Sequence, residues 1–182
     1  MFQCHAWWKM IFLFCSIVQL PFTCKKDDIM KYNVNFDTQY NQFYIADLMA
    51  SKKTDDVNFW SAEAYEDRLA MSSGIVGVGT ECYGTIKGEL VLLDSPNNNS
   101  QANNYDHIVE GGLQIKSGYL EVLDCPTNTK YLKVKVASGT YRVRIYSSNL
   151  KSVDGDKGND FYKIEIWPDD DLTRKVIKRY DK

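Results

Sequence analysis

The chain has 182 residues, of which 25% are charged and 44% hydrophobic, and its formal net charge is −2. This composition is typical of a soluble globular domain and excludes wholesale disorder. Because 22 basic residues face 24 acidic ones, no basic excess supports direct binding of nucleic acid. The length predicts one main domain, and the abundance of tyrosine and phenylalanine favours β-structure.

The N-terminal segment, residues 1–24, differs from the rest. It contains no acid and one base, Lys9, and residues 10–22 are apolar except for Ser16 and Gln19. As a helix this run would span roughly 20 Å, which is too short for a hydrocarbon core of about 30 Å. The pattern is typical of a secretory signal. Its end at Cys24 resembles the cleavage region of bacterial lipoproteins, in which the cysteine carries the lipid.

These features predict a signal over 1–24, a short tether over 25–31 and a single β-sandwich domain over 32–182. A lipid anchor at Cys24 is the one membrane contact we expect, and it would place the protein in the cell envelope. Two alternatives remain open. The signal could be cleaved without lipidation, or translation could start at Met30 and give a cytoplasmic protein. After Cys24 the net charge is −3, because only one base precedes it.

Along the domain, apolar and polar residues alternate with a period of two, which predicts half-buried antiparallel strands. The alternation is clearest in three segments of the second half, 132–136, 141–145 and 161–166. Weaker candidate strands are 33–36, 43–47, 75–80, 85–93, 112–116 and 119–123.

Short turns and one helix connect these strands. Ser138-Gly139 predicts a hairpin between 132–136 and 141–145, and 116–118 predicts another. A helix is expected over 61–71, with Ser61 as its N-cap. The polar stretches 94–104 and 155–159 read as surface loops. The expected fold is mainly β, an antiparallel β-sandwich with one short helix, with a barrel as the alternative.

The sequence offers few residues for catalysis, metal binding or a cofactor. His107 is the sole histidine of the domain, and no G-x-S-x-G motif accompanies it. We expect it at the start of a strand, half exposed. The loop with Asp154, Asp156 and Asp160 lacks the spacing of a calcium loop. We therefore expect a non-enzyme without cofactor or metal. Asp169, Asp170 and Asp171 follow Pro168 and read as a solvated run or as an acidic patch for a basic partner.

Two further groups of residues have two readings each. Cys82 and Cys125 could form a disulfide in an oxidising envelope, stabilising the fold by roughly 4 kcal/mol, or remain two buried thiols. Arg142 and Arg144 share the polar face of one strand. This face is either simply solvated or forms a small cationic patch that binds a carboxylate or phosphate. Trp60 and Trp167 are expected in the core.

Five segments follow one another in a set order: 40–44, 60–64, 75–80, 139–143 and 160–168. Together they resemble the competence protein J family of nuclease inhibitors, over roughly 35–168. The resemblance implies a small non-catalytic protein that binds a nuclease and blocks its active site. An exported inhibitor would suit an immunity role as well as competence.

Because the net charge is mild, acidic contacts to a basic enzyme would have to be local. The candidate partner-binding residues are therefore the two acidic segments with the adjacent tryptophan: Asp154, Asp156, Asp160, Asp169, Asp170, Asp171 and Trp167. A lipid-anchored envelope protein with a ligand- or glycan-binding sandwich is the alternative, with Trp60, Tyr83 and Tyr105 as its aromatic platform. An enzyme with dispersed carboxylates is the third possibility.

Overall fold

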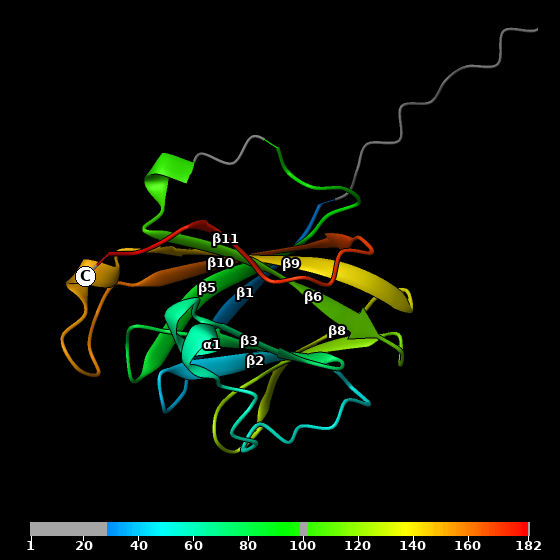
Figure 1. The fold of residues 1–182 in the computed structure, drawn as a ribbon, viewed down its shortest axis with the longest axis horizontal. Helices are drawn as coiled ribbons and strands as arrows, with labels where there is room; N and C mark the ends of the chain where they lie inside the picture. The colour runs from blue at the N-terminus through cyan, green and yellow to red at the C-terminus, as the bar shows by residue number, and fades with distance from the viewer. Residues whose placement is uncertain (1–28, 99–101, 182) are drawn as a thin grey trace, which may run out of the picture.

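The structure, a computed structural model, describes residues 29–98 and 102–181. Within these residues, eleven strands form two stacked sheets, accompanied by one short α-helix and two 3₁₀ turns (Figure 1). This arrangement confirms the expected β-sandwich with one short helix. The predicted signal, Cys24 and most of the tether lie outside the described residues.

Sheet A has six strands in the order β1-β5-β10-β9-β6-β11. Neighbouring strands are antiparallel except β5 and β10, which run parallel. In this order β10, which comes late in the chain, lies in the interior of the sheet between β5 and β9. The strands are β1 (Met30–Asp37), β5 (Thr85–Leu92), β6 (His107–Ile115), β9 (Gly139–Ser148), β10 (Phe161–Pro168) and β11 (Lys175–Lys178).

Sheet B has five strands in the order β3-β4-β2-β7-β8, and all of its pairs are antiparallel. The helix α1 (Ala62–Glu66) lies beside β3 (Figure 1). The strands are β2 (Gln42–Asp47), β3 (Leu69–Ser72), β4 (Ile75–Gly79), β7 (Tyr119–Leu123) and β8 (Lys130–Lys135).

The main core fills the space between the sheets, because successive side chains of a strand point to opposite faces. On β9, Tyr141, Val143 and Ile145 face this core. Across it, the ring of Phe43 on β2 meets that of Tyr162 on β10 at 6.3 Å in an edge-on contact. A smaller cluster on the outer side of sheet B contains Tyr44, Ala46, Phe59, Ala64, Ala70, Ile75, Leu123 and Cys125.

Both predicted hairpins are wrong. The segment at Ser138-Gly139 carries the chain from β8 in sheet B to β9 in sheet A, and residues 116–118 carry it from β6 to β7 in the same way. The two crossings are neighbours, since the Val136 amide donates to the Gly118 carbonyl at 3.0 Å. Alternation reveals which face of a strand is buried, but a sandwich strand in either sheet shows the same alternation.

The predicted helix over 61–71 is also shorter than expected. Ser61 caps it as predicted, with its hydroxyl accepting from the Ala64 amide at 3.2 Å. The helix ends because Arg68 adopts a left-handed conformation, φ 55°. The next residues form β3, which buries Leu69 in the main core and Ala70 in the outer cluster. Burial on both faces outweighs the helix propensity of this segment.

Candidate functional site

The acidic run after β10 forms a strap, residues 169–174, that crosses the outer face of sheet A to β11. Its carboxylates accept hydrogen bonds from nearby groups. Trp167 Nε1 donates to Asp169 at 3.2 Å, Thr140 Oγ1 to Asp170 at 2.7 Å, and Thr173 Oγ1 to Asp171 at 2.6 Å. These carboxylates therefore hold the strap in place, although Asp170 and Asp171 also face solvent.

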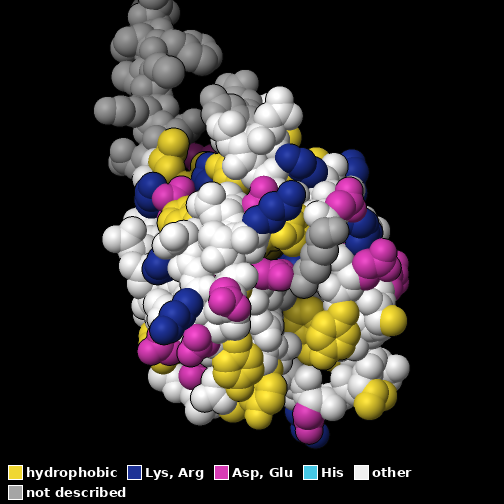
Figure 2. All heavy atoms as spheres, turned by 90° about the vertical axis from the view of Figure 1, so that its left-hand side faces the viewer, with side chains coloured by type: hydrophobic (Ala, Val, Ile, Leu, Met, Phe, Trp, Pro, Cys, Tyr) yellow, Lys and Arg dark blue, Asp and Glu magenta, His cyan; other side chains and the backbone are white. Residues whose placement is uncertain are grey.

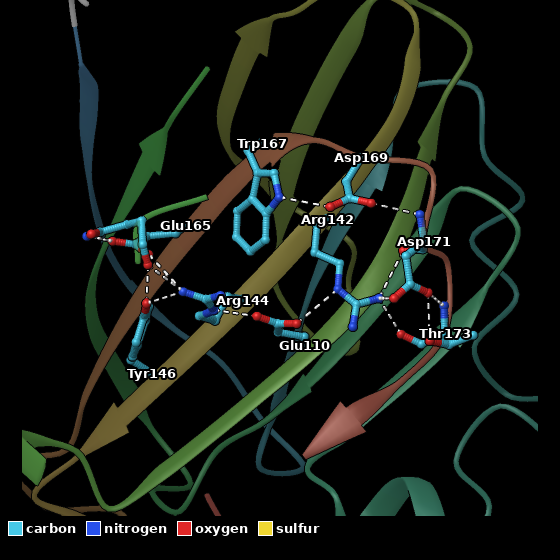
Figure 3. A network of polar contacts seen from close by, with 10 residues as sticks. Glu110, Arg142, Arg144, Tyr146, Glu165, Trp167, Asp169, Asp171 and Thr173 are labelled. Carbon is cyan, nitrogen blue, oxygen red and sulfur yellow. Dashed lines mark hydrogen bonds and ion pairs between the residues drawn. The ribbon is translucent and has the colours of Figure 1, made fainter. Parts of the chain in front are cut away.

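Beneath the strap lies a buried network of charged side chains (Figure 3). Arg142 Nη1 donates to the carbonyl oxygens of Asp171 at 2.9 Å and Thr173 at 2.6 Å, and its Nε lies 3.1 Å from Glu110 Oε2. Arg144 pairs with the other oxygen of Glu110. The two arginines expected on a solvated face or in a cationic patch are instead enclosed and matched by acids.

Strap and sheet approach closely at Gly112 on β6. A Cβ added there would lie 2.3 Å from the Cα of Leu172 in the strap, a distance that no real structure tolerates. The residue must therefore be glycine for the strap to lie this close to β6, and this close approach brings the strap carbonyls within reach of Arg142.

The network continues to Glu165 on β10. This carboxylate accepts from Tyr146 Oη at 2.8 Å and pairs with Lys163 at 2.7 Å. Burial alone would raise the pKa of Glu165, but the bonds from Lys163 and Tyr146 lower it. Burial, together with the bond to Glu165, raises the pKa of Tyr146 to about 12. Each charge thus has a fixed partner, as in a structural network.

Two of the predicted partner-binding residues are buried. Trp167 is 2% exposed, and the Arg144 guanidinium lies 4.9 Å from the centre of its ring (Figure 3). Asp160 is 2% exposed and accepts from the Cys82 amide at 3.2 Å and Tyr162 Oη at 2.6 Å. Neither side chain offers a surface to a partner.

Asp154 and Asp156 lie in an exposed loop that remains available for contact with a partner. The loop closes on itself, because the Asp154 amide donates to the Lys157 carbonyl at 2.8 Å. It also contacts the loop before β5, since the Tyr83 amide donates to the Gly155 carbonyl at 3.2 Å. Neither aspartate forms an ion pair with another described residue. Of the two acidic segments, this loop therefore has carboxylates without an ion-pair partner, whereas the strap carboxylates accept hydrogen bonds from other side chains of the protein.

Cys82 and Cys125 are both free and both buried, as two separate thiols. Cys82 lies beside Asp160, and its pKa is raised by burial and by that carboxylate. Cys125 Sγ accepts from Gln42 Nε2 at 3.0 Å and from Tyr44 Oη at 3.3 Å.

His107 is buried, at 1% exposure, rather than half exposed as expected. The Tyr180 amide donates to its Nδ1 at 3.3 Å, so Nε2 carries the proton and donates to the Asp67 carbonyl at 3.0 Å. Burial, opposed by this backbone bond, lowers the pKa of His107 to about 4. With both ring nitrogens engaged, this imidazole is placed for a structural role.

A pocket of about 550 Å³ lies at the end of the sandwich where β1 finishes and β2 begins. Four aromatic side chains line it together with Arg68: Tyr40, Trp60, Tyr65 and Tyr180. Sequence analysis missed this pocket, because its residues come from four separate segments. The one feature of the sequence that points to this pocket is the spacing of Gly77 and Gly79 in β4.

Two glycines of β4 make room for the walls of this pocket. A Cβ at Gly77 would lie 2.8 Å from the Trp60 ring, and one at Gly79 would lie 3.2 Å from Arg68 Cα. Trp60 and Arg68 can therefore pack directly on the backbone of sheet B. The GIVGVG segment thus has a packing role next to the pocket.

Neither a metal centre nor a membrane helix is found in the part of the chain that the structure describes. There, no group of three or more His, Cys, Asp or Glu side chains is placed to hold a metal ion. No helix among the same residues is long and apolar enough to cross a bilayer.

No protein-family model and no curated protein sequence matches the chain. Solved structures similar to it include ComJ from Bacillus subtilis, described as an inhibitor of the DNA-degrading activity of NucA. ComJ aligns with 17% identity and a TM-score of 0.60, over 77% of this chain and 98% of its own. The second is a protein described as crocagin biosynthetic gene J, with 17% identity, a TM-score of 0.51, and coverage of 77% of this chain and 97% of that one.

These two neighbours carry different functional descriptions, so the shared architecture does not by itself assign an activity. The resemblance first noted in five short segments is nevertheless matched in three dimensions, over nearly the whole of ComJ. In its fold, the described part of the chain is therefore a ComJ-like domain.

Proposed function

We propose that this protein is a non-catalytic inhibitor, of the competence or immunity type, that binds a nuclease and blocks its active site. The observation that carries the proposal is the similarity to a nuclease inhibitor over 98% of that inhibitor's length. At this level of identity the partner need not be NucA itself.

A non-catalytic role agrees with the environment of the titratable groups. His107 is enclosed with both nitrogens engaged. The carboxylates of Glu110 and Glu165 are held by arginine, lysine and tyrosine side chains. A general base must reach a substrate proton, and these three groups are buried and already hydrogen-bonded within the protein.

The exposed aspartates suggest how inhibition would work. Asp154 and Asp156 present carboxylates on a short loop with no ion-pair partner among the described residues. A nuclease binds phosphates with basic side chains, so carboxylates of this kind could occupy part of its phosphate-binding groove. This would need a local acidic contact rather than mimicry of DNA over the whole surface.

We place the protein in the cell envelope, held by a lipid on Cys24. The support is the N-terminal sequence, with an apolar run that ends at a cysteine. Mass spectrometry of the native N-terminus tests this: a diacylglyceryl mass on Cys24 is expected. An unmodified protein that begins at Met30 would instead make it cytoplasmic, and all of β1 would still be present.

An envelope protein that binds glycans is the second candidate, favoured by the exposed rings of Tyr40, Tyr65 and Tyr83. Tyr105, expected in the same platform, lies elsewhere and packs on Tyr146 at 4.6 Å. Retention on immobilised polysaccharide, lost on mutating these three rings, would support this candidate over the inhibitor.

The test of the inhibitor is a DNA-degradation assay with the purified full chain. Purified NucA and a panel of bacterial endonucleases would be titrated with it. We expect at least one enzyme to lose activity stoichiometrically, with a 1:1 complex by size-exclusion chromatography and light scattering. If every nuclease keeps its full rate at excess protein, the inhibitor proposal is wrong.

A further inference from the structure

The pocket at the end of β1 is part of a surface with exposed rings on three separate segments. Tyr40 is 60%, Tyr65 62% and Tyr83 42% exposed. We call this surface the tyrosine end; it comprises loops 38–41, 80–84 and 153–159 with residues 65–68. Figure 2 views the molecule from the left-hand side of Figure 1, where these loops lie, and shows hydrophobic and acidic side chains side by side.

We propose that the tyrosine end is the surface with which the protein binds its partner protein, with Tyr40, Tyr65 and Tyr83 as the main contacts. The inference rests on the proposed function, under which that partner is a nuclease. Tyrosine, tryptophan and arginine supply most of the binding energy at protein interfaces. This end presents all three types, since Trp60 and Arg68 line the pocket together with Tyr40 and Tyr65.

The rings are held in place before any partner arrives. Tyr40 and Tyr83 meet at 6.2 Å, and Tyr65 stacks on Trp60 at 5.1 Å. Side chains that are already ordered lose little conformational entropy on binding. The contacts therefore favour tight association more than isolated, mobile rings would.

The backbone at this end is also unusual. Tyr40, Asn41 and Arg68 have φ of 56°, 53° and 55°, and they are three of the five described non-glycine residues with positive φ. Such conformations cost free energy, and they tend to cluster where a surface is shaped for binding. Here they direct the chain around the pocket that these three residues help to line.

The ring geometry favours a protein over a glycan. A sugar needs an open, flat ring face, but Tyr65 stacks on one face of Trp60. Tyr40 and Tyr83 meet at an interplanar angle of 66°, so they form no common plane. Rings at different angles around a pocket suit the irregular side chains of a protein surface.

The polar surroundings suit a basic partner. Arg68 pairs with Glu81, and Arg179 pairs with Glu66 and Asp67, so the arginines at this end are matched by acids. The free carboxylates of Asp154 and Asp156 lie on the loop that bonds to Tyr83. Although Lys157 is exposed on the same loop, these two carboxylates are available to pair with basic side chains of the partner.

Access to this end follows from the path of β1. Met30 pairs with Leu92 at one end of the sandwich, and Asp37 pairs with Thr85 at the other, about 23 Å away for eight extended residues. The stretch from Cys24 to Met30 spans at most about 20 Å. An anchor at Cys24 would therefore be attached to the domain at the end of β1 opposite the tyrosine end.

The test compares four single substitutions in the full chain against the nuclease found in the inhibition assay. Tyr65→Ala and Tyr83→Ala remove rings, and Tyr40→Asn does so with a residue that tolerates positive φ. Tyr119→Ala is the matched control, because Tyr119 lies at the opposite end of the sandwich, where it pairs with Lys135. Thermal unfolding confirms that each variant folds, and calorimetry gives its Kd for the nuclease.

We expect each variant at the tyrosine end to bind about thirtyfold or more weakly, and Tyr119→Ala to bind like the wild type. Normal binding by all three variants would overturn this interface and leave the inhibitor function standing. If the wild type inhibits no nuclease, the proposed function fails, and the interface with it. Binding of the wild type to a glycan array through the same three tyrosines would overturn a protein interface in favour of a glycan site.

Discussion

The buried histidine makes a quantitative prediction about stability. Replacing His107 with Gln keeps an amide N–H and an amide oxygen near the Asp67 carbonyl and the Tyr180 amide, but removes the group that titrates. In the native protein His107 is neutral, because Tyr180 donates to Nδ1 and a proton there would break that bond. We expect the substitution to flatten the dependence of the unfolding free energy on pH.

The magnitude follows from the two pKa values of His107. The unfolded chain has the ordinary value of 6.5, and burial lowers the folded pKa of His107 to about 4. Between these values the unfolded state binds the extra proton, so stability falls as pH falls. The full effect is about 3 kcal/mol, and about 2 kcal/mol of it is lost between pH 7 and pH 5.

Urea unfolding at pH 7 and at pH 5, followed by tryptophan fluorescence, measures this loss. Over that range the ordinary carboxylates change charge little, so the difference between wild type and His107→Gln isolates the histidine. Equal losses in wild type and His107→Gln would refute the assignment to His107.

Three further predictions test the packing. Gly112→Ala should destabilise the fold by about 1–3 kcal/mol, since its Cβ would meet the strap backbone. Gly139→Ala is the control, because its Cβ would have no neighbour nearer than 4.0 Å, and it should change the urea midpoint little. Equal urea midpoints for the two variants would count against the strap contact. Ser61→Ala should cost about 1 kcal/mol of unfolding free energy by removing the helix cap, and an unchanged value would discount that bond. Cys82 and Cys125 should resist thiol labelling until denaturant is added, as mapped by mass spectrometry; rapid labelling of either in the native protein would contradict their burial.

Much of the fold could be predicted from alternation alone. The strand at 119–123 matches β7 at both ends, and 75–80 and 85–93 exceed β4 and β5 by one residue each. Alternation works for these strands because each has one face in the core. β11 was missed because a four-residue edge strand, with alternating exposed and half-buried side chains, carries little apolar pattern.

The site could be predicted far less well. Single-residue chemistry indicated Asp154 and Asp156 as exposed acids, and the structure leaves them exposed. Trp167 was expected both in the core and among the partner-binding residues. It is buried, and its burial depends on Arg144 and the strap, which only the folded chain brings together. The pocket around Tyr40 and Tyr180 depends on tertiary proximity between residues 140 positions apart, for which the sequence holds no local signal.

The position of β10 has a consequence for the order in which the protein is made. Sheet A holds β5 and β9 together only through β10, the last of its interior strands to be synthesised. While the ribosome is still adding residues before Phe161, β5 lacks its parallel neighbour, and β9 lacks one of its two partners. The sandwich core can therefore close only when nearly the whole chain has been synthesised.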